Sequence, residues 1–286
     1  MSIFTKTAIK NAANYAAATY DSVAIIAREV ARRLDARLDF MRIQPQVILD
    51  LGAGTGYSSG FLAKRYPEAQ IIAVDFAESM LKQAQKNHSA QPEITWICAD
   101  AEQLPLPEFS VDLVVSNFML PWCEDIEAVL AETQRVLKPG GLLLFSTLGP
   151  DTLQELRASW AEVDEMAHVH VFFDMHDIGD AILRAHLVEP VMDREVIMLS
   201  YANPRQLLRD LKLCGWQNLL VERHQFLTGK KRLQKFLENY EKWRDKESRF
   251  PVTYEVIYGH AFCVEKRFNE NMQEFSISVS EIKRRR

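Results

Sequence analysis

Two hydrophobic spacings alternate along the first half of the chain. Short, almost continuous apolar runs are typical of buried strands, and they cover residues 47–50, 71–75, 94–100, 111–117 and 142–147. Apolar positions three and four residues apart predict helices before and between them, over 21–41, 57–66, 78–86 and 126–137. Because strands without a polar face need cover on both sides, this order predicts an α/β fold with a mostly parallel sheet and helices on both faces.

The second half of the chain has a different order of elements. Its spacing predicts two helices, a strand, two consecutive helices and a closing strand, over 150–163, 175–187, 195–201, 203–216, 231–246 and 253–266. Two helices inserted between late strands cannot lie within the sheet. We therefore expect them to cover its rim.

Composition narrows the setting in which the protein works. The 286 residues carry a formal net charge of -5, which gives no global reason to expect nucleic-acid binding. The chain lacks an apolar run long enough for a membrane span or a secretory signal. Its four cysteines lie far apart, as is typical of free thiols in a reducing compartment. We expect a cytoplasmic protein that binds neither nucleic acid nor membrane. His168 and His170 lack a convincing partner ligand, so we expect no metal.

A glycine-rich stretch, VILDLGAGTGYSSG at 47–60, follows the first predicted strand. Tyr57 stands where the dinucleotide pattern G-x-G-x-x-G has its third glycine. Asp50 precedes the turn, and its carboxylate would repel a pyrophosphate but suits an ammonium or a sulfonium. S-adenosylmethionine carries both charges, so the turn (Gly52, Ala53, Gly54 and Gly56) is predicted to bind this cofactor.

Polar residues also follow the next three strands, where ligands of parallel sheets bind. Asp75 can accept both ribose hydroxyls, and Asp100 can accept the adenine amino group. The other predicted cofactor contacts at these ends are Phe76, Met80, Ala101, Glu102, Asn117 and Phe118. A helix N-cap is the alternative for Asp75 or Asp100 taken singly. Four successive polar strand ends favour a binding site.

This set resembles the class I S-adenosylmethionine-dependent methyltransferases across residues 45–147. The resemblance implies a Rossmann-like, mostly parallel seven-stranded sheet. Other segments resemble one family within that class, the malonyl-acyl-carrier-protein O-methyltransferases of biotin synthesis. They are TYDSVAIIAREVARRL, STLGPDTLQELRASWAEVD, DMHDIGD, LLRDLKLCGWQN and TYEVIYGHA, within a likeness that runs from about residue 12 to 264. The family commonly has Phe and Arg where this chain has Ala13 and Tyr15.

The resemblance implies methyl transfer from S-adenosylmethionine to the free carboxyl of a malonyl group on acyl-carrier protein. We expect the enzyme to be a monomer. We expect one domain over 1–266, followed by a polar tail over 267–286 that has no counterpart in this family. Within that domain we expect an N-terminal helical lid, a cofactor-binding core, a segment of late helices and a strand, an inserted helical lid and a closing strand, at 1–44, 45–150, 151–202, 203–250 and 251–266.

Candidate acceptor residues follow from the same resemblance and from charge. Tyr20 is expected to close over the cofactor and position the acceptor, or else to be a core tyrosine. Arg209 is our candidate for holding the malonyl carboxylate, its alternative being an exposed helix arginine. Lys230, Lys231 and Arg232 suit an acidic carrier protein, although a solvated helix face explains them equally well. Trp122 is a pocket wall or a core residue.

Two other functions stay open at this stage. A mitochondrial group that hydroxylates a protein arginine during respiratory complex I assembly shares segments similar to GPDTL. A small-molecule methyltransferase, acting on a quinone or a free acid, would share the cofactor half.

Overall fold

One mixed sheet organises the computed structural model, which describes residues 5–90, 93–221 and 228–264. In these ranges it has seven strands, in the order β3-β2-β1-β4-β5-β7-β6. Their bounds are β1 Val47–Leu51, β2 Gln70–Asp75, β3 Ile94–Cys98, β4 Val111–Asn117, β5 Leu137–Leu148, β6 Leu187–Tyr201 and β7 Phe250–Cys263. Strands β1 to β5 pair in parallel, and β7 is antiparallel to both β5 and β6. The predicted α/β fold with a mostly parallel, seven-stranded sheet is confirmed.

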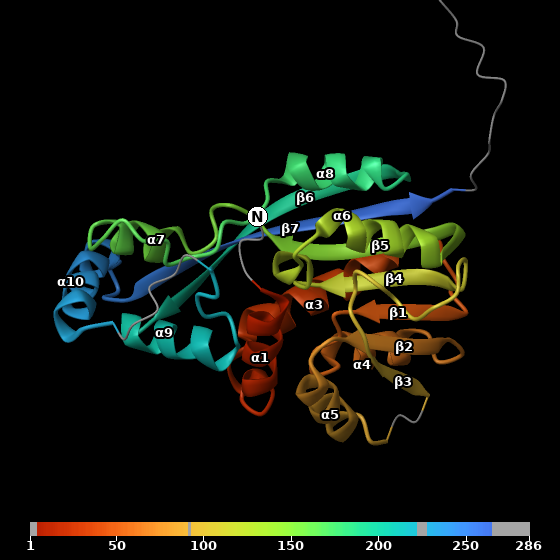
Figure 1. Ribbon diagram of the computed structural model, residues 1–286, viewed down its shortest axis with the longest axis horizontal. Coiled ribbons are helices and arrows are strands. Elements are labelled where there is room, and N and C mark those ends of the chain that lie inside the picture. The colour runs from red at the N-terminus through yellow and green to blue at the C-terminus, as the bar shows by residue number, and fades with distance from the viewer. Residues whose placement is uncertain (1–4, 91–92, 222–227, 265–286) are drawn as a thin grey trace, which may run out of the picture.

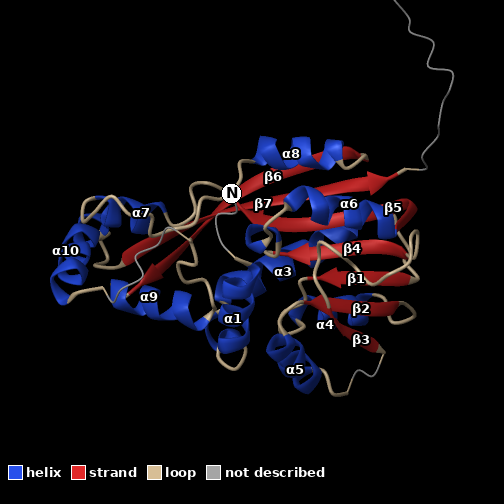
Figure 2. Cartoon of the chain, in the orientation of Figure 1, coloured by secondary structure: helices blue, strands red, loops and turns tan. Residues whose placement is uncertain are grey.

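Helices cover both faces of this sheet (Figures 1 and 2). They are α1 Lys6–Ala16, α2 Tyr20–Val23, α3 Ile25–Arg37, α4 Tyr57–Arg65, α5 Glu78–Asn87, α6 Ile126–Val136, α7 Gln154–Ala161, α8 Met175–Arg184, α9 Pro204–Leu213 and α10 Lys230–Tyr240. Single turns of 3-10 helix lie at Leu38–Phe40, Leu120–Trp122 and Glu241–Trp243. Among these described helices, none is both long and apolar enough to cross a membrane.

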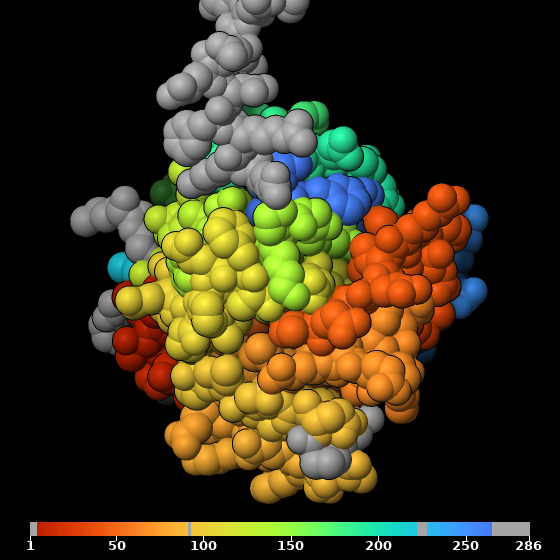
Figure 3. Space-filling model, turned by 90° about the vertical axis from the view of Figure 1, so that its right-hand side faces the viewer, coloured from red at the N-terminus to blue at the C-terminus, as the bar shows by residue number. Residues whose placement is uncertain are grey.

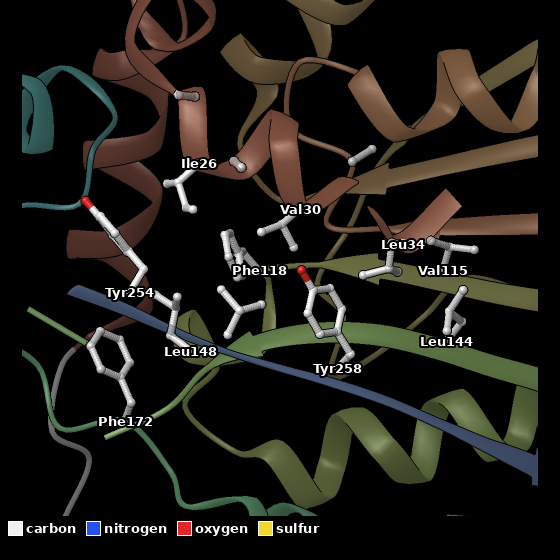
Figure 4. Close-up of a cluster of buried hydrophobic side chains, with 14 of the residues drawn as sticks. Ile26, Val30, Leu34, Val115, Phe118, Leu144, Leu148, Phe172, Tyr254 and Tyr258 are labelled. Atoms are coloured by element: carbon white, nitrogen blue, oxygen red, sulfur yellow. The ribbon is translucent and has the colours of Figure 1, made fainter. Parts of the chain in front are cut away.

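The apolar stripe of α3 explains how one face of the sheet is buried. Ile26, Val30 and Leu34 recur at helical spacing and pack with Val115 and Leu144 of the central strands (Figure 4). On the opposite face, α6 and α8 pack against the other side chains of the same strands. Both faces are therefore dry, which accounts for the near-continuous apolar runs in the sequence.

Several element boundaries differ from the prediction. Strand β6 begins at Leu187, well before the predicted start at residue 195, because residues 187–201 pair along β7. It is an edge strand with a mixed burial pattern, so its first half carries no clear apolar signal. Strand β5 begins at Leu137 rather than 142, and α10 ends at Tyr240 rather than 246.

The segment between β6 and β7 forms α9 and α10, which lie with α7 around the ends of β6 and β7 that extend past the parallel strands (Figure 1). Helix α1 lies between this group and the carboxyl ends of the parallel strands. Figure 3 faces the opposite end of the molecule, where residues of the first half of the chain make up most of the visible surface. The predicted polar tail at 267–286 lies outside the described residues.

Candidate cofactor and acceptor site

A pocket lies at the carboxyl ends of the parallel strands, beneath α1. Predicted site residues supply much of its wall: Tyr20, Gly52, Gly54, Asp75, Phe76, Met80, Asp100, Ala101, Glu102, Asn117, Phe118 and Trp122. The remaining lining residues are Lys6, Ile9, Ala13, Leu51, Val74, Ala99, Met119, Cys123, Cys214, Gly215 and Trp216. The fold thus brings together groups that are up to about 200 positions apart in the sequence.

Two glycines of the turn after β1 line the pocket, and the space above the backbone is open at Gly54. Gly52 and Gly54 both have positive φ, at +78° and +55°. A Cβ on Gly52 would lie 2.4 Å from the Met119 side chain, so only glycine fits there. At Gly54 no atom lies within 4 Å of a Cβ position, and this residue lines the pocket. The turn therefore offers a bare backbone surface to a ligand.

Ala53 and Gly56 shape this turn without lining the pocket. The Ala53 amide donates to the Val74 carbonyl at 2.9 Å, and the Gly56 amide donates to the Ala53 carbonyl at 2.9 Å. Gly56 has φ +83° and packs beneath the turn, near Trp96 and His88. Neither residue lines the pocket, so their contact with the cofactor stays a prediction.

Asp50 is buried under the turn instead of facing the pocket. The Ser59 hydroxyl of α4 donates to its carboxyl group at 2.5 Å. Burial raises the pKa of Asp50 to about 7, although the Ser59 hydrogen bond opposes this shift. This placement does not fit the predicted direct contact between Asp50 and the cofactor's charge, because strand alternation and burial direct the side chain to the α4 side. Asp50 ties the glycine turn to α4.

Asp75 lines the pocket with its carboxylate held by two backbone amides. Gly54 donates to Oδ2 at 2.9 Å and Ala77 donates to Oδ1 at 2.8 Å. Burial raises the pKa of Asp75, and the two amide hydrogen bonds act against that rise. The N-cap of α5 is Ala77, so Asp75 does not occupy the position of the capping alternative. Each carboxylate oxygen keeps capacity for a further donor.

Lys6 brings a cation to the acidic side of the pocket. Its ammonium lies 2.6 Å from the Asp100 carboxylate and 2.7 Å from that of Glu102. Partial burial acts to raise the pKa of Asp100, but the hydrogen bond from Lys6 holds it below its ordinary value. The Lys6 amide donates to Glu124 at 2.8 Å. This residue was missed because nothing in the local sequence around position 6 links it to residues 100 and 102.

The N-terminal segment is fastened to the glycine turn and to α9. The Thr55 hydroxyl donates to Asp21 at 2.6 Å, and the Asn87 amide donates to the other oxygen of Asp21 at 2.9 Å. The Thr19 hydroxyl donates to the Leu213 carbonyl at 2.9 Å. Tyr20 lies between these anchors, lines the pocket and also packs against the main core. Burial raises the pKa of its phenol, so it stays neutral.

The strand end after β4 is apolar toward the pocket. The Asn117 side chain turns back into the protein, where it donates to the Ala27 carbonyl at 3.0 Å and accepts from the Ser146 hydroxyl at 2.8 Å. Phe118 follows with a positive φ of 56° and is buried. Asn117 therefore fixes the backbone, while Phe118 and Met119 supply the wall.

The predicted acceptor cations lie elsewhere. Helix α9 buries Pro204, Leu207 and Leu211, which directs Arg209 to solvent on the opposite side. Arg209 does not line the cofactor pocket, and this position does not fit the predicted clamp on the acceptor carboxylate. Arg232 forms an ion pair with Asp164.

Lys230 and Lys231 are exposed at the start of α10. Within the described ranges, no group of three or more His, Cys, Asp or Glu side chains is arranged to hold a metal ion.

Comparison with known proteins places this geometry in a family. A family profile described as a methyltransferase domain matches residues 49–145. The malonyl-acyl-carrier-protein O-methyltransferase of Gallionella capsiferriformans is 44% identical over 275 residues, covering 94% of each chain. A Coxiella burnetii protein of the same name is 43% identical and covers 97% of this chain and 96% of its own.

Solved structures share the fold at low sequence identity. The YcgJ protein from Bacillus subtilis has a TM-score of 0.58 at 16% identity, covering 82% of this chain and 99% of its own. A Haemonchus contortus phosphoethanolamine N-methyltransferase, in complex with S-adenosylhomocysteine, has a TM-score of 0.52 at 15% identity and covers 83% and 53%. These structures confirm the predicted class I methyltransferase fold. The two curated relatives show that the chain belongs to the malonyl-acyl-carrier-protein O-methyltransferase family.

Proposed function

We propose that the protein transfers a methyl group from S-adenosylmethionine to the free carboxyl of a malonyl thioester on acyl-carrier protein, and that the ester enters biotin synthesis. The observation that carries this is the 44% identity, over 94% of both chains, to a relative named for that reaction. Its partner is thus an acyl-carrier protein, and we expect it to act as a monomer in the cytoplasm. The same relatives give no support to the arginine hydroxylase alternative.

The pocket residues suit S-adenosylmethionine, which supplies an electrophilic methyl group on a sulfonium. The bare backbone at Gly54 admits the methionine part of the ligand. Asp75, held by two amides, accepts from the ribose hydroxyls, and Asp100 accepts from the adenine amino group. Phe76 and Met80 supply apolar packing.

The chemistry requires positioning more than proton transfer. A malonyl carboxylate is already ionised at neutral pH, so it attacks without a general base. The protein has to align one carboxylate oxygen with the methyl group and exclude water. Tyr20 beneath α1 closes the pocket, and Phe118 and Trp122 line the acceptor side. Lys230 and Lys231 contribute to the surface that attracts the carrier.

The direct test is methyl transfer by the purified protein. Malonyl-carrier protein is incubated with S-adenosylmethionine labelled in the methyl group, and the carrier is examined by mass spectrometry for the methyl ester. We expect a labelled ester that mild base removes. Absence of label on the carrier, with cofactor bound and another acceptor labelled, would reject the proposal.

Two further measurements separate the alternatives. Equal activity on malonyl-coenzyme A and malonyl-carrier protein would favour a small-molecule methyltransferase, whereas a preference for the carrier supports the proposal. Rescue of a biotin auxotroph that lacks the corresponding methyltransferase provides the cellular test.

A further inference from the structure

A second pocket, of about 180 Å³, adjoins the cofactor pocket. Its wall comes from the end of β5, α7, α9 and the segments around residues 168–172 and 216–218; the lining residues are Trp122, Leu148, Leu153, Leu156, Trp160, His168, Val169, His170, Phe172, Leu208, Leu211, Lys212, Trp216, Gln217 and Asn218. A water molecule needs only roughly 15 Å³ of such space. The pocket is large enough, and apolar enough, for an organic chain.

Two tryptophans form the boundary between the pockets. Trp122 and Trp216 line both, and their ring centroids lie 6.0 Å apart. Trp216 also makes an edge contact with Phe118 of the cofactor pocket, at 5.6 Å between centroids. On the other side, Trp122 makes an edge contact with His170 at 5.2 Å. A molecule seated in the second pocket therefore meets the cofactor pocket at these two rings.

Basic side chains lie beside this second pocket. Arg205, Arg209 and Lys212 are exposed and recur at spacings of four and three along α9, so they form one stripe on its outer side. Within the described residues none of the three forms an ion pair closer than 4 Å. Lys212 also lines the second pocket. The stripe thus leads from solvent to the pocket wall.

The start of α10 is linked to the opposite wall. Arg232 pairs with Asp164, whose carboxylate also contacts His168 at 2.9 Å, and His168 stacks on Trp160 at 4.0 Å between centroids. Both aromatic rings line the second pocket. The exposed Lys230 and Lys231 stand at the start of the same helix as Arg232. Positive charge accordingly flanks the pocket on two helices of a chain whose net charge is -5.

We infer that this second pocket receives the thioester-bearing phosphopantetheine arm of the acyl-carrier protein and delivers its malonyl end past Trp122 and Trp216 to the methyl donor, while Arg205, Arg209 and Lys212 bind the acidic carrier. This assignment rests on the proposed function. The apolar walls suit the aliphatic parts of the arm, and the basic stripe suits its phosphate and the carrier surface. Arg209 then acts in carrier docking, which its solvent-facing position permits.

Blocking the pocket tests the assignment without requiring catalysis. Leu208 lines the second pocket and not the first, so Leu208→Trp narrows it from the partly exposed side. Leu183→Trp, at an exposed site on α8, is the matched control. Calorimetry in the presence of S-adenosylhomocysteine measures the affinity of each protein for malonyl-carrier and for the same carrier without its arm.

For the unmodified protein and Leu183→Trp we expect at least tenfold tighter binding of the carrier that bears the arm. In Leu208→Trp we expect the affinities for the carrier with and without its arm to lie within about twofold of each other. Unchanged affinity for S-adenosylhomocysteine shows that the cofactor site of this variant is intact. A ratio unchanged by Leu208→Trp, or equal affinity of the unmodified protein for both carriers, overturns the assignment. Failure of the proposed function is seen separately, as absence of labelled methyl ester from the unmodified protein.

The basic stripe has its own variant. The double variant Arg209→Glu, Lys212→Glu is expected to bind the carrier at least fivefold more weakly, both with and without the arm, because the positive charge that attracts the carrier surface is reversed in either case. Lys64→Glu, at an exposed site on α4, is the control and should leave both affinities within twofold. Unchanged affinity in the double variant would remove the stripe from the assignment.

Discussion

Asp75 is oriented before any ligand arrives, because the amides of Gly54 and Ala77 hold its two oxygens. For Asp75→Asn we predict about 10- to 100-fold weaker binding of S-adenosylmethionine, since a hydrogen bond to a charged group contributes about 1.5–3 kcal/mol. Calorimetric titration measures the change. Asp180→Asn, at an exposed position on α8, is the control and should bind normally. Equal affinity in Asp75→Asn would remove this residue from the cofactor site.

Asp50 makes a prediction for pH dependence. Its pKa of about 7 in the folded protein exceeds the value of about 3.9 in an unfolded chain, so the folded state holds the proton more tightly. Burying Asp50 therefore lowers the free energy of unfolding least below about pH 4, where the carboxyl group is protonated in both states. Between about pH 4 and pH 7, ionisation of Asp50 lowers the free energy of unfolding by up to about 1.4 kcal/mol per pH unit.

Asp50→Asn should accordingly gain unfolding free energy relative to the parent between pH 5 and 7, and this gain should level off above about pH 8. Urea unfolding at each pH measures this difference, with Asp180→Asn as the reference. A difference that does not depend on pH would contradict the shift.

For single residues, the sequence predicts which of them come together at the site but not always the direction in which their side chains point. Asp75 and Asp100 were found because parallel strands end at one edge, and both line the pocket. Asp50 lies on a neighbouring strand, yet its side chain points to Ser59. The solvent-facing direction of Arg209 could have been read from the apolar spacing of α9. The position of Lys6 in the site could not be predicted from the sequence, because only folding brings this residue next to Asp100.

Helix α1 covers the cofactor pocket, and its backbone packs closely against Gly215. This glycine has φ +78°, and a Cβ there would lie 3.2 Å from the Ala12 carbonyl of α1. Gly215→Ala should lower stability by about 1–2 kcal/mol through the left-handed backbone and also push α1 outward. We therefore predict several-fold faster dissociation of S-adenosylmethionine, measured by stopped-flow fluorescence.

Gly140→Ala is the control that separates the effect of backbone strain from the effect of a steric contact with α1. Gly140 has a similar φ of +79°, and no atom lies within 4 Å of its Cβ position. It should lose similar stability without a change in cofactor dissociation. Equal dissociation rates in the two variants would show that α1 does not hold the cofactor.

Strands that are buried on both faces were predicted more accurately from the sequence than strands at the edge of the sheet. The central strands were found from sequence because both faces are dry, whereas the edge strand β6 was found only in its second half because its exposed side mixes polar and apolar residues. The inserted helices were also expected from their spacing. The second pocket between α7, α9 and the β5 end was not, since it arises from packing among distant segments.

The whole molecule is mildly acidic, so an acidic partner has to be attracted by local charge on α9 and α10. Raising the salt concentration from 50 to 300 mM should therefore raise the KM for malonyl-carrier protein several-fold, because exposed charges are screened. The KM for a short malonyl thioester without carrier should stay constant in the same assay. A parallel rise for both acceptors would contradict electrostatic docking.

Trp122 and Trp216, as walls of both pockets, have a thermodynamic consequence. Any ligand that reorients these rings in one pocket changes the shape of the other, so the two binding equilibria are linked. Linkage is reciprocal: the factor by which the methyl donor changes affinity for the acceptor must equal the factor by which the acceptor changes affinity for the donor. If the methyl donor and its demethylated product place these rings differently, the affinity of the other pocket for the acceptor must differ between the two cofactor forms by the same factor as the acceptor's effects on the binding of those two forms.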